Sequence, residues 1–554
     1  FDLFVFFRAG RSLLEMAPLT VNIRKSRGAT DCILFVASGT AVVAAAQPAP
    51  APAKEPTAAP VGGGVRASKA ALRGRPNLGA LCCIGAAPPV GGRPAPRGAV
   101  ARAEDSTTDE SSTDEPTGTH AAKTTRGVIR AGVRGDILWS VLKADILEDL
   151  VTCQPGQLVA RIPGLGPACT KNATHQALTS DGLHLPFWPK CWSFTADSTP
   201  DAFCDQVFSN LPKKSVLIFK PDKSAQGNGV AVVHGEAALR RCLKDRQALF
   251  GSALVQQYID RPMLLDGLKF DFRVYVLVTP ATSDQTTLSQ LGPAFVCREG
   301  LARFCTEPYE PPTLANAHRS AVHLTNTSVG RYSENFVVTQ DVGAGLVGTK
   351  RALSAVVRLL VERRQLASPE AFWSQLEFLV STTLARLGPA AYQEMRSPFM
   401  YEDISPLPTG VKTTAALADT VTRRVGSCFS VLGFDVLLDE TGQLFLLEVN
   451  SGPSLKIEDV LPLPSRSAAE TNLLMMEAKK FRAPQTPAVG YGGRWHRPCR
   501  CAELHRPHIH QMSLVDAHVK CQVVQGVCAI LDARKEMPDD PPAWATGTSF
   551  FLID

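Results

Sequence analysis

The sequence predicts a mixed α/β fold, and three patterns carry that prediction. Residues 431–438 and 444–449 are apolar runs joined by the turn-forming sequence Asp-Glu-Thr-Gly, which is typical of a β-hairpin. Residues 270–278 alternate apolar and polar side chains, as a half-buried strand does. Residues 369–387 instead place their apolar side chains at helical spacing. Strands and helices are therefore both expected.

The composition is that of a globular protein with a large core. The chain has 554 residues, of which 45% are hydrophobic and 20% charged. Its net charge of +6 favours an acidic partner only weakly. The 15 cysteines have scattered spacings, which favours reduced thiols over a disulfide framework. We expect a monomer with no membrane-spanning segment and no nucleic-acid partner.

Residues 1–126 are predicted to be a low-complexity, disordered leader. They are rich in Ala, Pro and Gly, and residues 104–115 form an acidic Ser/Thr run. A basic stretch at residues 24–27 precedes an apolar run at 32–46, a pattern that also resembles a signal or transit sequence. We favour the disordered leader and leave a targeting role open. Order is expected from about residue 127.

The first ordered part contains a glycine-rich loop. Residues 137–150 have helical spacing, residues 158–170 read as a loop, and the aromatic cluster at 187–192 is expected in the core. Residues 216–219 and 230–233 are predicted strands that flank the loop at 224–229. Such a loop lets backbone N–H groups approach phosphates, with Lys220 as a point charge beside them. An ordinary turn is the alternative.

The next strands carry an unusual charged stripe. Residues 254–259 form a short predicted strand, and 295–304 read as a strand pair. Lys269, Asp271 and Arg273 alternate with apolar residues and therefore share one face of their strand. The alternative is a charged ladder that faces solvent.

Helical spacing returns further along. It covers residues 350–364, 369–387 (where Gly388-Pro389 should end the helix), 411–424 and 468–481. Residues 482–554 show no clear period and are predicted to be an irregular tail. They contain a cluster that lacks standard zinc spacing, so a metal site there is only an open alternative: Cys499, Cys501, His505, His508 and His510.

The hairpin carries the residues that suggest a metal site. Asp435 lies on its first strand, and Glu448 and Asn450 are two apart on the second, so these two share a face. Two carboxylates and an amide oxygen suit Mg²⁺ that bridges nucleotide phosphates. The alternative is a pair of solvated carboxylates on an edge hairpin.

Taken together, these motifs resemble the tubulin–tyrosine-ligase-like family, most closely its polyglutamylase branch. The resemblance rests on RIPG at 161–164, KPDKSAQGNG at 220–229, DGLKFDFRVYVLVT at 266–279, EGLARF at 299–304, HLTNTS at 323–328, and GFDVLLD with LLEVNSGPSL at 433–455. It implies an ATP-grasp fold at 215–481, with two α+β lobes that clamp ATP, preceded by a smaller N-terminal α/β subdomain at 127–214.

The resemblance also implies the roles of particular residues. Lys220, Arg303, Arg273 and Lys350 would be catalytic, and Asp435, Glu448 and Asn450 would bind Mg²⁺. The incoming amino acid would contact Arg303, Thr327, Ser328, Lys350 and Ser451. ATP would contact Lys220, Gln226, Gly227, Gln256, Gln257, Tyr258, Ile259, Lys269, Asp271, Thr325 and Asn326.

The implied activity is an ATP-dependent ligase. It would activate glutamate side chains of tubulin C-terminal tails as acylphosphates and join free L-glutamate to them, in the cytoplasm and cytoskeleton or at a cilium or basal body. The sequence departs from the family pattern at Thr327, Asn228 and Ser451, where Tyr, Arg and His are usual. A glycine ligase, a ligase on another acidic protein, and a non-catalytic microtubule-binding protein are therefore alternatives.

Overall fold

The computed structural model describes most of the chain from residue 136 onward. The described residues are 136–140, 142–280, 291–339, 342–343, 347–462 and 508–553, together with two strands, β1 (Asp2–Val5) and β2 (Leu19–Ile23). The strands β1 and β2 pair with each other, and β2 also pairs with β3. The prediction of a disordered leader stays a prediction. The rest of the predicted leader, the predicted helix at 468–481 and the residues Cys499, Cys501 and His505 lie outside the described residues.

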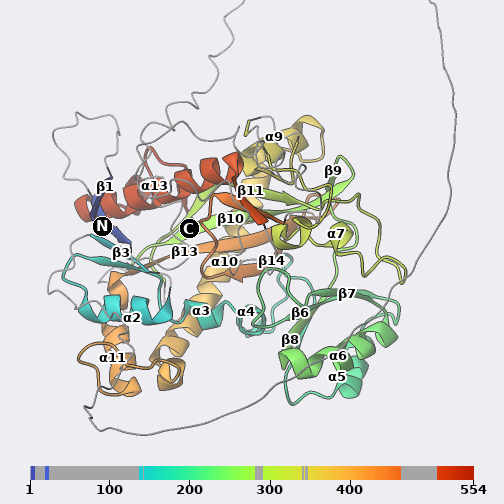
Figure 1. Cartoon of the computed structure of the whole chain (residues 1–554), viewed down its shortest axis with the longest axis horizontal. Helices are drawn as coiled ribbons and strands as arrows, with labels where there is room; N and C mark the ends of the chain where they lie inside the picture. The colour runs from blue at the N-terminus through green and yellow to red at the C-terminus, as the bar shows by residue number, and fades with distance from the viewer. Residues whose placement is uncertain are drawn as a thin grey trace, which may run out of the picture. The chain divides into compact units, whose positions relative to one another are not determined.

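A central sheet of 11 strands organises the described part of the chain (Figure 1). The predicted hairpin lies within it as β13 (Cys428–Leu438) and β14 (Leu444–Asn450). The strand order is β1-β2-β3-β4-β13-β10-β11-β12, with β14 beside β13, β17 beside β11 and β9 beside β10. The remaining strands are β3 (Ile137–Trp139), β4 (Leu158–Ala160), β9 (Leu264–Leu265), β10 (Leu268–Val278), β11 (Ala294–Phe304), β12 (Lys350–Ala352) and β17 (Phe550–Ile553).

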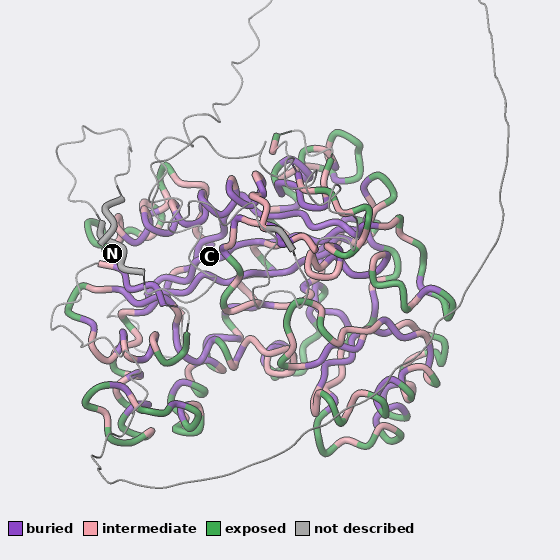
Figure 2. The backbone as a smooth tube through the Cα atoms, viewed as in Figure 1, coloured by how far each residue is buried: buried purple, intermediate pink, exposed green. Residues whose placement is uncertain are grey.

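The two faces of this sheet bury different sets of side chains. Phe272, Val274 and Val276 on β10 pack into a core with the helices α9 (Leu353–Glu362) and α10 (Pro369–Arg396). On the opposite face, Tyr275 and Leu277 pack against α13 (Leu514–Glu536), which crosses the sheet on the other side from α10 (Figure 1). The strands and α13 are accordingly buried along most of their length (Figure 2).

Helix α13 overturns the prediction of an irregular tail. Residues 508–553 contain α13, the strand β16 (His508–Met512), which pairs with β15 (Glu458–Pro462), and the helix α14 (Pro541–Trp544). The buried residues of α13 come in consecutive runs rather than as one stripe, so its sequence shows no amphipathic period. By length and composition α13 is the one helix among the described residues that could span a membrane, so the expectation of no such segment stays a prediction. However, 72% of its apolar window is buried in the fold, as in a core helix.

Helix α10 also runs further than predicted, through Pro389 to Arg396. Proline in a helix interior removes one hydrogen bond and costs about 3 kcal/mol. The buried residues Leu384, Leu387, Ala391 and Met395 continue the same apolar stripe on both sides of the proline. Packing of that stripe against the core therefore holds the helix together.

Short strands were the elements that the periodicity missed. The predicted helix at 137–150 is β3 followed by α2 (Lys143–Thr152), and the predicted loop at 158–170 contains β4 and α3 (Leu165–Ala168). Similarly, β12 precedes α9, and residues 295–304 lie in one strand, β11, instead of two. Runs of three residues are too short to separate a period of 2 from one of 3.6. The predicted helix at 411–424 is present as α11 (Thr414–Arg424).

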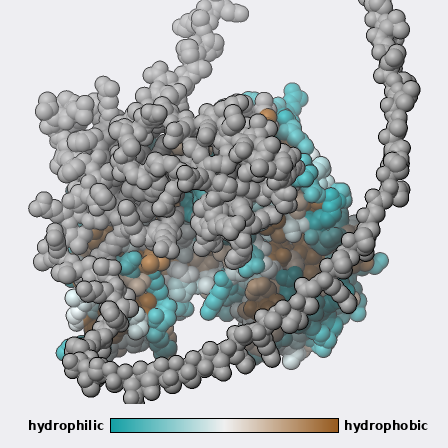
Figure 3. Space-filling view, viewed as in Figure 1, coloured by the Kyte–Doolittle hydropathy of each residue, from teal (hydrophilic) through white to brown (hydrophobic). Residues whose placement is uncertain are grey.

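A second sheet, of four strands in the order β5-β8-β6-β7, carries the glycine-rich loop. Its helices α5 (Pro200–Ser209) and α6 (Glu236–Phe250) direct Phe203, Leu239 and Leu243 into a separate core. In the region of these helices, Figure 3 shows hydrophilic residues together with hydrophobic ones. The strands are β5 (Cys191–Phe194), β6 (Val216–Pro221), β7 (Ala231–His234) and β8 (Ala253–Gln257), and the short helices α4 (Lys171–Thr179), α7 (Ser320–His323) and α8 (Thr327–Gly330) lie outside this sheet.

Candidate active site

The hairpin places two of the predicted metal ligands directly opposite each other. Asp435 on β13 is the cross-strand partner of Glu448 on β14. Strand β13 lies inside the sheet, between β10 and β14, and the Asp435 side chain is only 3% exposed. The alternative of two solvated carboxylates on an edge hairpin is therefore wrong for Asp435, while Glu448 remains partly exposed.

Two arginines surround Asp435. Arg303 donates to Asp271 through Nε (2.8 Å) and Nη2 (2.6 Å), and its Nη2 also lies 2.9 Å from Asp435 Oδ2. Arg273 Nη2 donates to the same oxygen over 2.9 Å. Burial by itself raises the pKa of Asp435, but the two guanidinium groups outweigh it and hold that pKa below its usual range. This buried, paired arrangement excludes the solvent-facing charged ladder.

The glycine-rich loop lies between β6 and β7 and turns back over α8. Gln226, Gly227 and Gly229 have φ values of 60°, 72° and 73°, in the left-handed region that favours glycine. Ser328 Oγ donates to the Gln226 carbonyl oxygen (2.7 Å). A Cβ on Gly227 would lie 3.1 Å from Asn326 Oδ1. The loop is therefore held close to the segment that carries Thr325 and Asn326.

Lys220 and Lys269 are buried ammonium groups with only neutral partners among the described residues. Lys220 Nζ donates to Gln256 Oε1 (2.6 Å) and to the Leu447 carbonyl (3.2 Å). Lys269 Nζ donates to Tyr258 Oη (2.9 Å) and to the His323 carbonyl (3.1 Å). Burial lowers the pKa of each lysine to about 8. Two buried cations that form no direct ion pair with a described carboxylate suit an anionic ligand.

These groups converge on one cavity, to which both sheets contribute. All eleven residues predicted to contact ATP line it, together with Arg303, Asp435 and Glu448. Four cationic side chains (Lys171, Lys220, Lys269, Arg303) face three acidic ones (Asp271, Asp435, Glu448), so the lining has an excess of one positive charge.

Comparison with known proteins supports the resemblance seen in the motifs. Residues 193–463 match the tubulin-tyrosine ligase family. This chain contains a tubulin-tyrosine ligase family domain. It is similar to tubulin polyglutamylase ttll-11 of Caenorhabditis elegans (31% identity over 342 residues, 60% of this chain and 43% of that protein) and to tubulin polyglutamylase TTLL11 of Homo sapiens (32% over 315 residues, 54% and 38%). The match therefore spans about two fifths of the length of these relatives.

The remaining predicted site residues of the tubulin-tyrosine ligase domain do not line the cavity. Arg273 and Ser328 each donate a hydrogen bond to a residue that does line the cavity: Arg273 to Asp435, and Ser328 to the Gln226 carbonyl. Lys350 is buried, and its ammonium pairs with Asp459 (2.6 Å) and with Asp516 of α13. The roles predicted for Thr327, Lys350 and Ser451 toward the incoming amino acid stay predictions.

Sequence reasoning missed Lys171 of α4. Its Nζ donates to the Ser224 carbonyl (2.8 Å) in the glycine-rich loop and lies 3.9 Å from Glu448 Oε2. Lys171 therefore links the loop to the hairpin across the cavity. No spacing in the sequence marks it, because α4, the loop and the hairpin are distant in the chain.

The donor set of the domain fits Mg²⁺ that arrives with a polyphosphate. Asp435 and Glu448 supply carboxylate oxygens, and Asn450 lies close to them, with Nδ2 3.4 Å from Glu448 Oε1. Mg²⁺ commonly binds one or two carboxylates and takes its other ligands from phosphates and water. No group of three or more His, Cys, Asp or Glu residues in the described ranges could hold a metal alone. His510, from the predicted Cys/His cluster, instead bonds Glu458 through Nδ1 (2.9 Å to Oε2).

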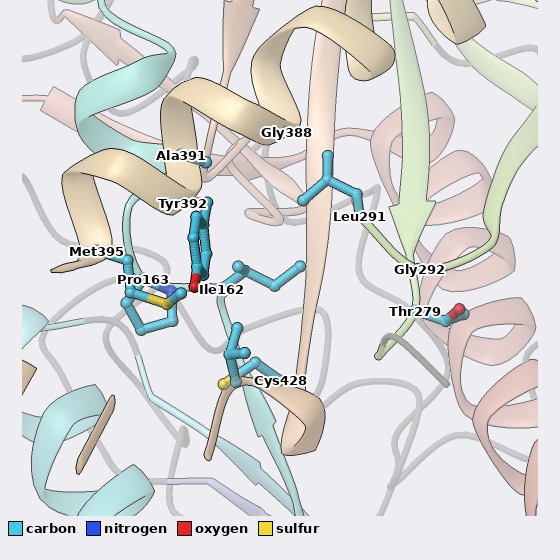
Figure 4. A pocket seen from close by; sticks show the side chains of 11 residues that line it. Ile162, Pro163, Thr279, Leu291, Gly292, Gly388, Ala391, Tyr392, Met395 and Cys428 are labelled. Carbon is cyan, nitrogen blue, oxygen red and sulfur yellow. The ribbon is translucent and has the colours of Figure 1, made fainter. Parts of the chain in front are cut away.

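A second cavity, of about 400 Å³, lies between α10 and the segment after β4 (Figure 4). Tyr392 of α10 lies beside Pro163 in this view, and Cys428 lines the same space. Every lining side chain is uncharged. We assign no chemistry to this cavity.

Proposed function

We propose that this chain is an ATP- and Mg²⁺-dependent ligase that adds glutamate to glutamate side chains of tubulin C-terminal tails. The observation that carries the proposal is the single cavity in which the eleven predicted ATP contacts meet Arg303, Asp435 and Glu448. The names of the relatives, tubulin polyglutamylases, supply the substrate. We also propose the ATP-grasp fold, with the four-stranded and 11-stranded sheets as the two lobes around the nucleotide.

The charged residues divide into two groups with different tasks. Lys220 and Lys269, whose present partners are neutral, would bind the phosphates together with the backbone of the glycine-rich loop. The backbone of β8 and the residues that follow it, up to Ile259, would bind adenine. Asp435, Glu448 and Asn450 would hold Mg²⁺, which when bound neutralises the charge on phosphate oxygens. Arg303 and Arg273 are already fixed by carboxylates, so they add positive charge in a set geometry.

The chemistry requires positioning more than covalent help. A carboxylate acylates poorly at neutral pH, so phosphorylation of the acceptor side chain to an acylphosphate would make it reactive. The amine of the incoming glutamate would then attack the acyl carbon, and phosphate would leave. A rigid, buried set of cations at this point stabilises the oxygen charge without having to reorganise. The buried thiol of Cys191, whose pKa burial raises to about 12, has no part in this scheme.

The proposed partners follow from this reaction. They are free L-glutamate and the acidic tails of tubulin, toward which a net charge of +6 provides weak long-range attraction. A cytoplasmic, cytoskeletal location, including a cilium or basal body, is part of the proposal. It rests only on the proposed substrate.

A ligase assay with the purified chain tests the proposal. Microtubules, ATP, Mg²⁺ and one labelled amino acid at a time are incubated with the chain or with its Glu448→Gln variant. Glu440→Gln is the matched control, since Glu440 lies on the exposed turn of the same hairpin and forms an ion pair with exposed Arg261. We expect glutamate incorporation that falls at least a hundredfold in Glu448→Gln and is unchanged in Glu440→Gln.

Each other outcome identifies an alternative. Incorporation of glycine instead of glutamate would show that Thr327 and Ser451 have changed the specificity. Incorporation into another acidic protein, but not into microtubules, would exclude tubulin as the acceptor. Binding of microtubules without any incorporation would refute the ligase and leave a binding protein.

A further inference from the structure

Arg161 occupies a backbone conformation that arginine rarely adopts. It follows β4 directly, and its φ is 86°, in the left-handed region. Two contacts to β13 fix this conformation: Arg161 N–H donates to the Phe429 carbonyl (2.6 Å), and Ile162 N–H donates to Ser430 Oγ (2.7 Å). A residue held in this region by its surroundings often marks a functional position. The fold therefore aims the Arg161 side chain in one direction.

The Arg161 guanidinium lies against the end of β14 and has no polar partner among the described residues. A Cβ on Gly452 would lie 2.7 Å from its Cζ, Nη1 and Nη2. Burial lowers the pKa of Arg161, and no described carboxylate offsets that cost. The neighbouring cations differ, since Arg273, Arg303 and Lys350 each pair with aspartates. Arg161 is thus a largely buried positive charge whose hydrogen-bond donors remain available.

The position of Arg161 is outside the cavity but next to the candidate metal ligands. It does not line the cavity, whereas Glu448 does. Gly452 lies two positions beyond Asn450, the last residue of β14. In the proposed reaction the acceptor carboxylate must approach the terminal phosphate from the side opposite the rest of the nucleotide. Arg161 and Gly452 lie beside the candidate metal ligands but are not part of the lining proposed to hold ATP.

We propose that Arg161 binds a carboxylate of the acidic acceptor peptide other than the one being joined. This inference rests on the proposed function and names a residue that recognises its substrate. The planar guanidinium matches a carboxylate through two parallel hydrogen bonds, which a lysine cannot reproduce. In a run of glutamates, the side chains that flank the reacting one carry further carboxylates, and Arg161 lies next to the segment that carries the candidate metal ligands. Gly452 leaves room for the guanidinium at this place.

The test measures peptide binding separately from activity. A fluorescently labelled peptide that contains a run of glutamates, and the same peptide with glutamines, are titrated with the full chain by fluorescence anisotropy. The variants are Arg161→Gln, Arg161→Lys and Gly452→Ala, whose new Cβ displaces the guanidinium. Arg364→Gln is the matched control, because Arg364 also has a left-handed φ (58°) but is exposed. ATP affinity and thermal unfolding are measured for each variant.

We expect Arg161→Gln and Gly452→Ala to weaken binding of the glutamate peptide at least tenfold, with a smaller loss in Arg161→Lys. Arg364→Gln, binding of the glutamine peptide and ATP affinity should not change. Arg161→Gln should unfold at the same temperature as the parent or higher, since it removes an unpaired buried charge.

Equal affinity of Arg161→Gln and the parent for the glutamate peptide would overturn the inference. If the unfolding temperature of Arg161→Gln were also lower, Arg161 would have a structural role instead. Failure of the parent to bind ATP would refute the proposed function instead. The two failures are therefore distinguishable.

Discussion

Replacement of Asp516 by Asn should reduce the stability of the whole domain. Asp516 of α13 is 2% exposed and accepts hydrogen bonds from two buried lysines, Lys350 of β12 and Lys520 one turn further along α13 (Oδ1–Nζ 2.7 Å). A second aspartate, Asp459 of β15, pairs only with Lys350 among the described residues. The variant would thus leave two buried ammonium groups beside one carboxylate.

The magnitude follows from burial. Loss of one partner from a buried ion pair costs about 3–5 kcal/mol, because the remaining charge is left uncompensated. The matched control is Asp419→Asn, which removes an exposed Asp from a pair with Arg423 at the same i,i+4 spacing. For such an exposed pair the expected cost is only about 0.3–0.5 kcal/mol. The lysines also lower the pKa of Asp516, so its contribution is present above the usual carboxyl pKa of 3.8 and disappears as the pH falls further.

Urea unfolding followed by circular dichroism measures these differences. A double-mutant cycle that compares Asp516→Asn, Lys350→Met and the double variant should give a coupling free energy between Asp516 and Lys350 of about 1–3 kcal/mol. The reasoning would be refuted if Asp516→Asn unfolded within 1 kcal/mol of the parent while the KM for glutamate rose in both single variants. In that case Lys350 would bind the incoming amino acid, as the family resemblance implies, and would not serve mainly to dock α13.

Two further predictions concern the nucleotide. Calorimetric titration of ATP at pH 8, in buffers of different ionisation enthalpy, should show uptake of roughly one proton, because Lys220 and Lys269 are half-deprotonated at their pKa of about 8 and become fully charged beside phosphate. Lys220→Met should halve this uptake, and the absence of any uptake in the parent would show that neither lysine meets the phosphates. Gly227→Ala should weaken ATP binding several-fold, because its Cβ would crowd Asn326 and Val329 at 3.1 Å. Gly182→Ala has the same φ of 72° with nothing within 4 Å, so equal ATP affinities of the two variants would contradict the proposed role of the loop.

Much of the candidate site could be predicted because strand periodicity assigns side chains to faces. Alternation placed Asp271 and Arg273 together on β10, and the spacing of two placed Glu448 with Asn450 on β14. The turn residues predicted the hairpin, but a register shift between Asp435 and Val436, which the sequence did not reveal, brings Asp435 opposite Glu448. Local sequence therefore carried enough information for the hairpin and for the charged stripe. The motifs that carry the family resemblance then assigned these residues to a common nucleotide and metal site.

Periodicity failed where burial is uniform or elements are short. Helix α13 is buried on several sides, so no stripe marked it, and β3, β4 and β12 have three residues each. The continuation of α10 through Pro389 depends on packing that no local rule reveals. In each case the deciding interaction is with a distant segment.

By itself, the sequence determined which side chains share a strand face and which chemistry they suit. Only the tertiary structure decided that Arg273 meets Asp435, 162 residues away, and that Lys350 meets Asp516, 166 residues away. Among the described residues it likewise left Arg161, next to Gly452, without a counter-charge. The physical reason is that strand periodicity is a property of neighbouring residues, whereas the partner of a buried charge depends on how distant segments pack around it.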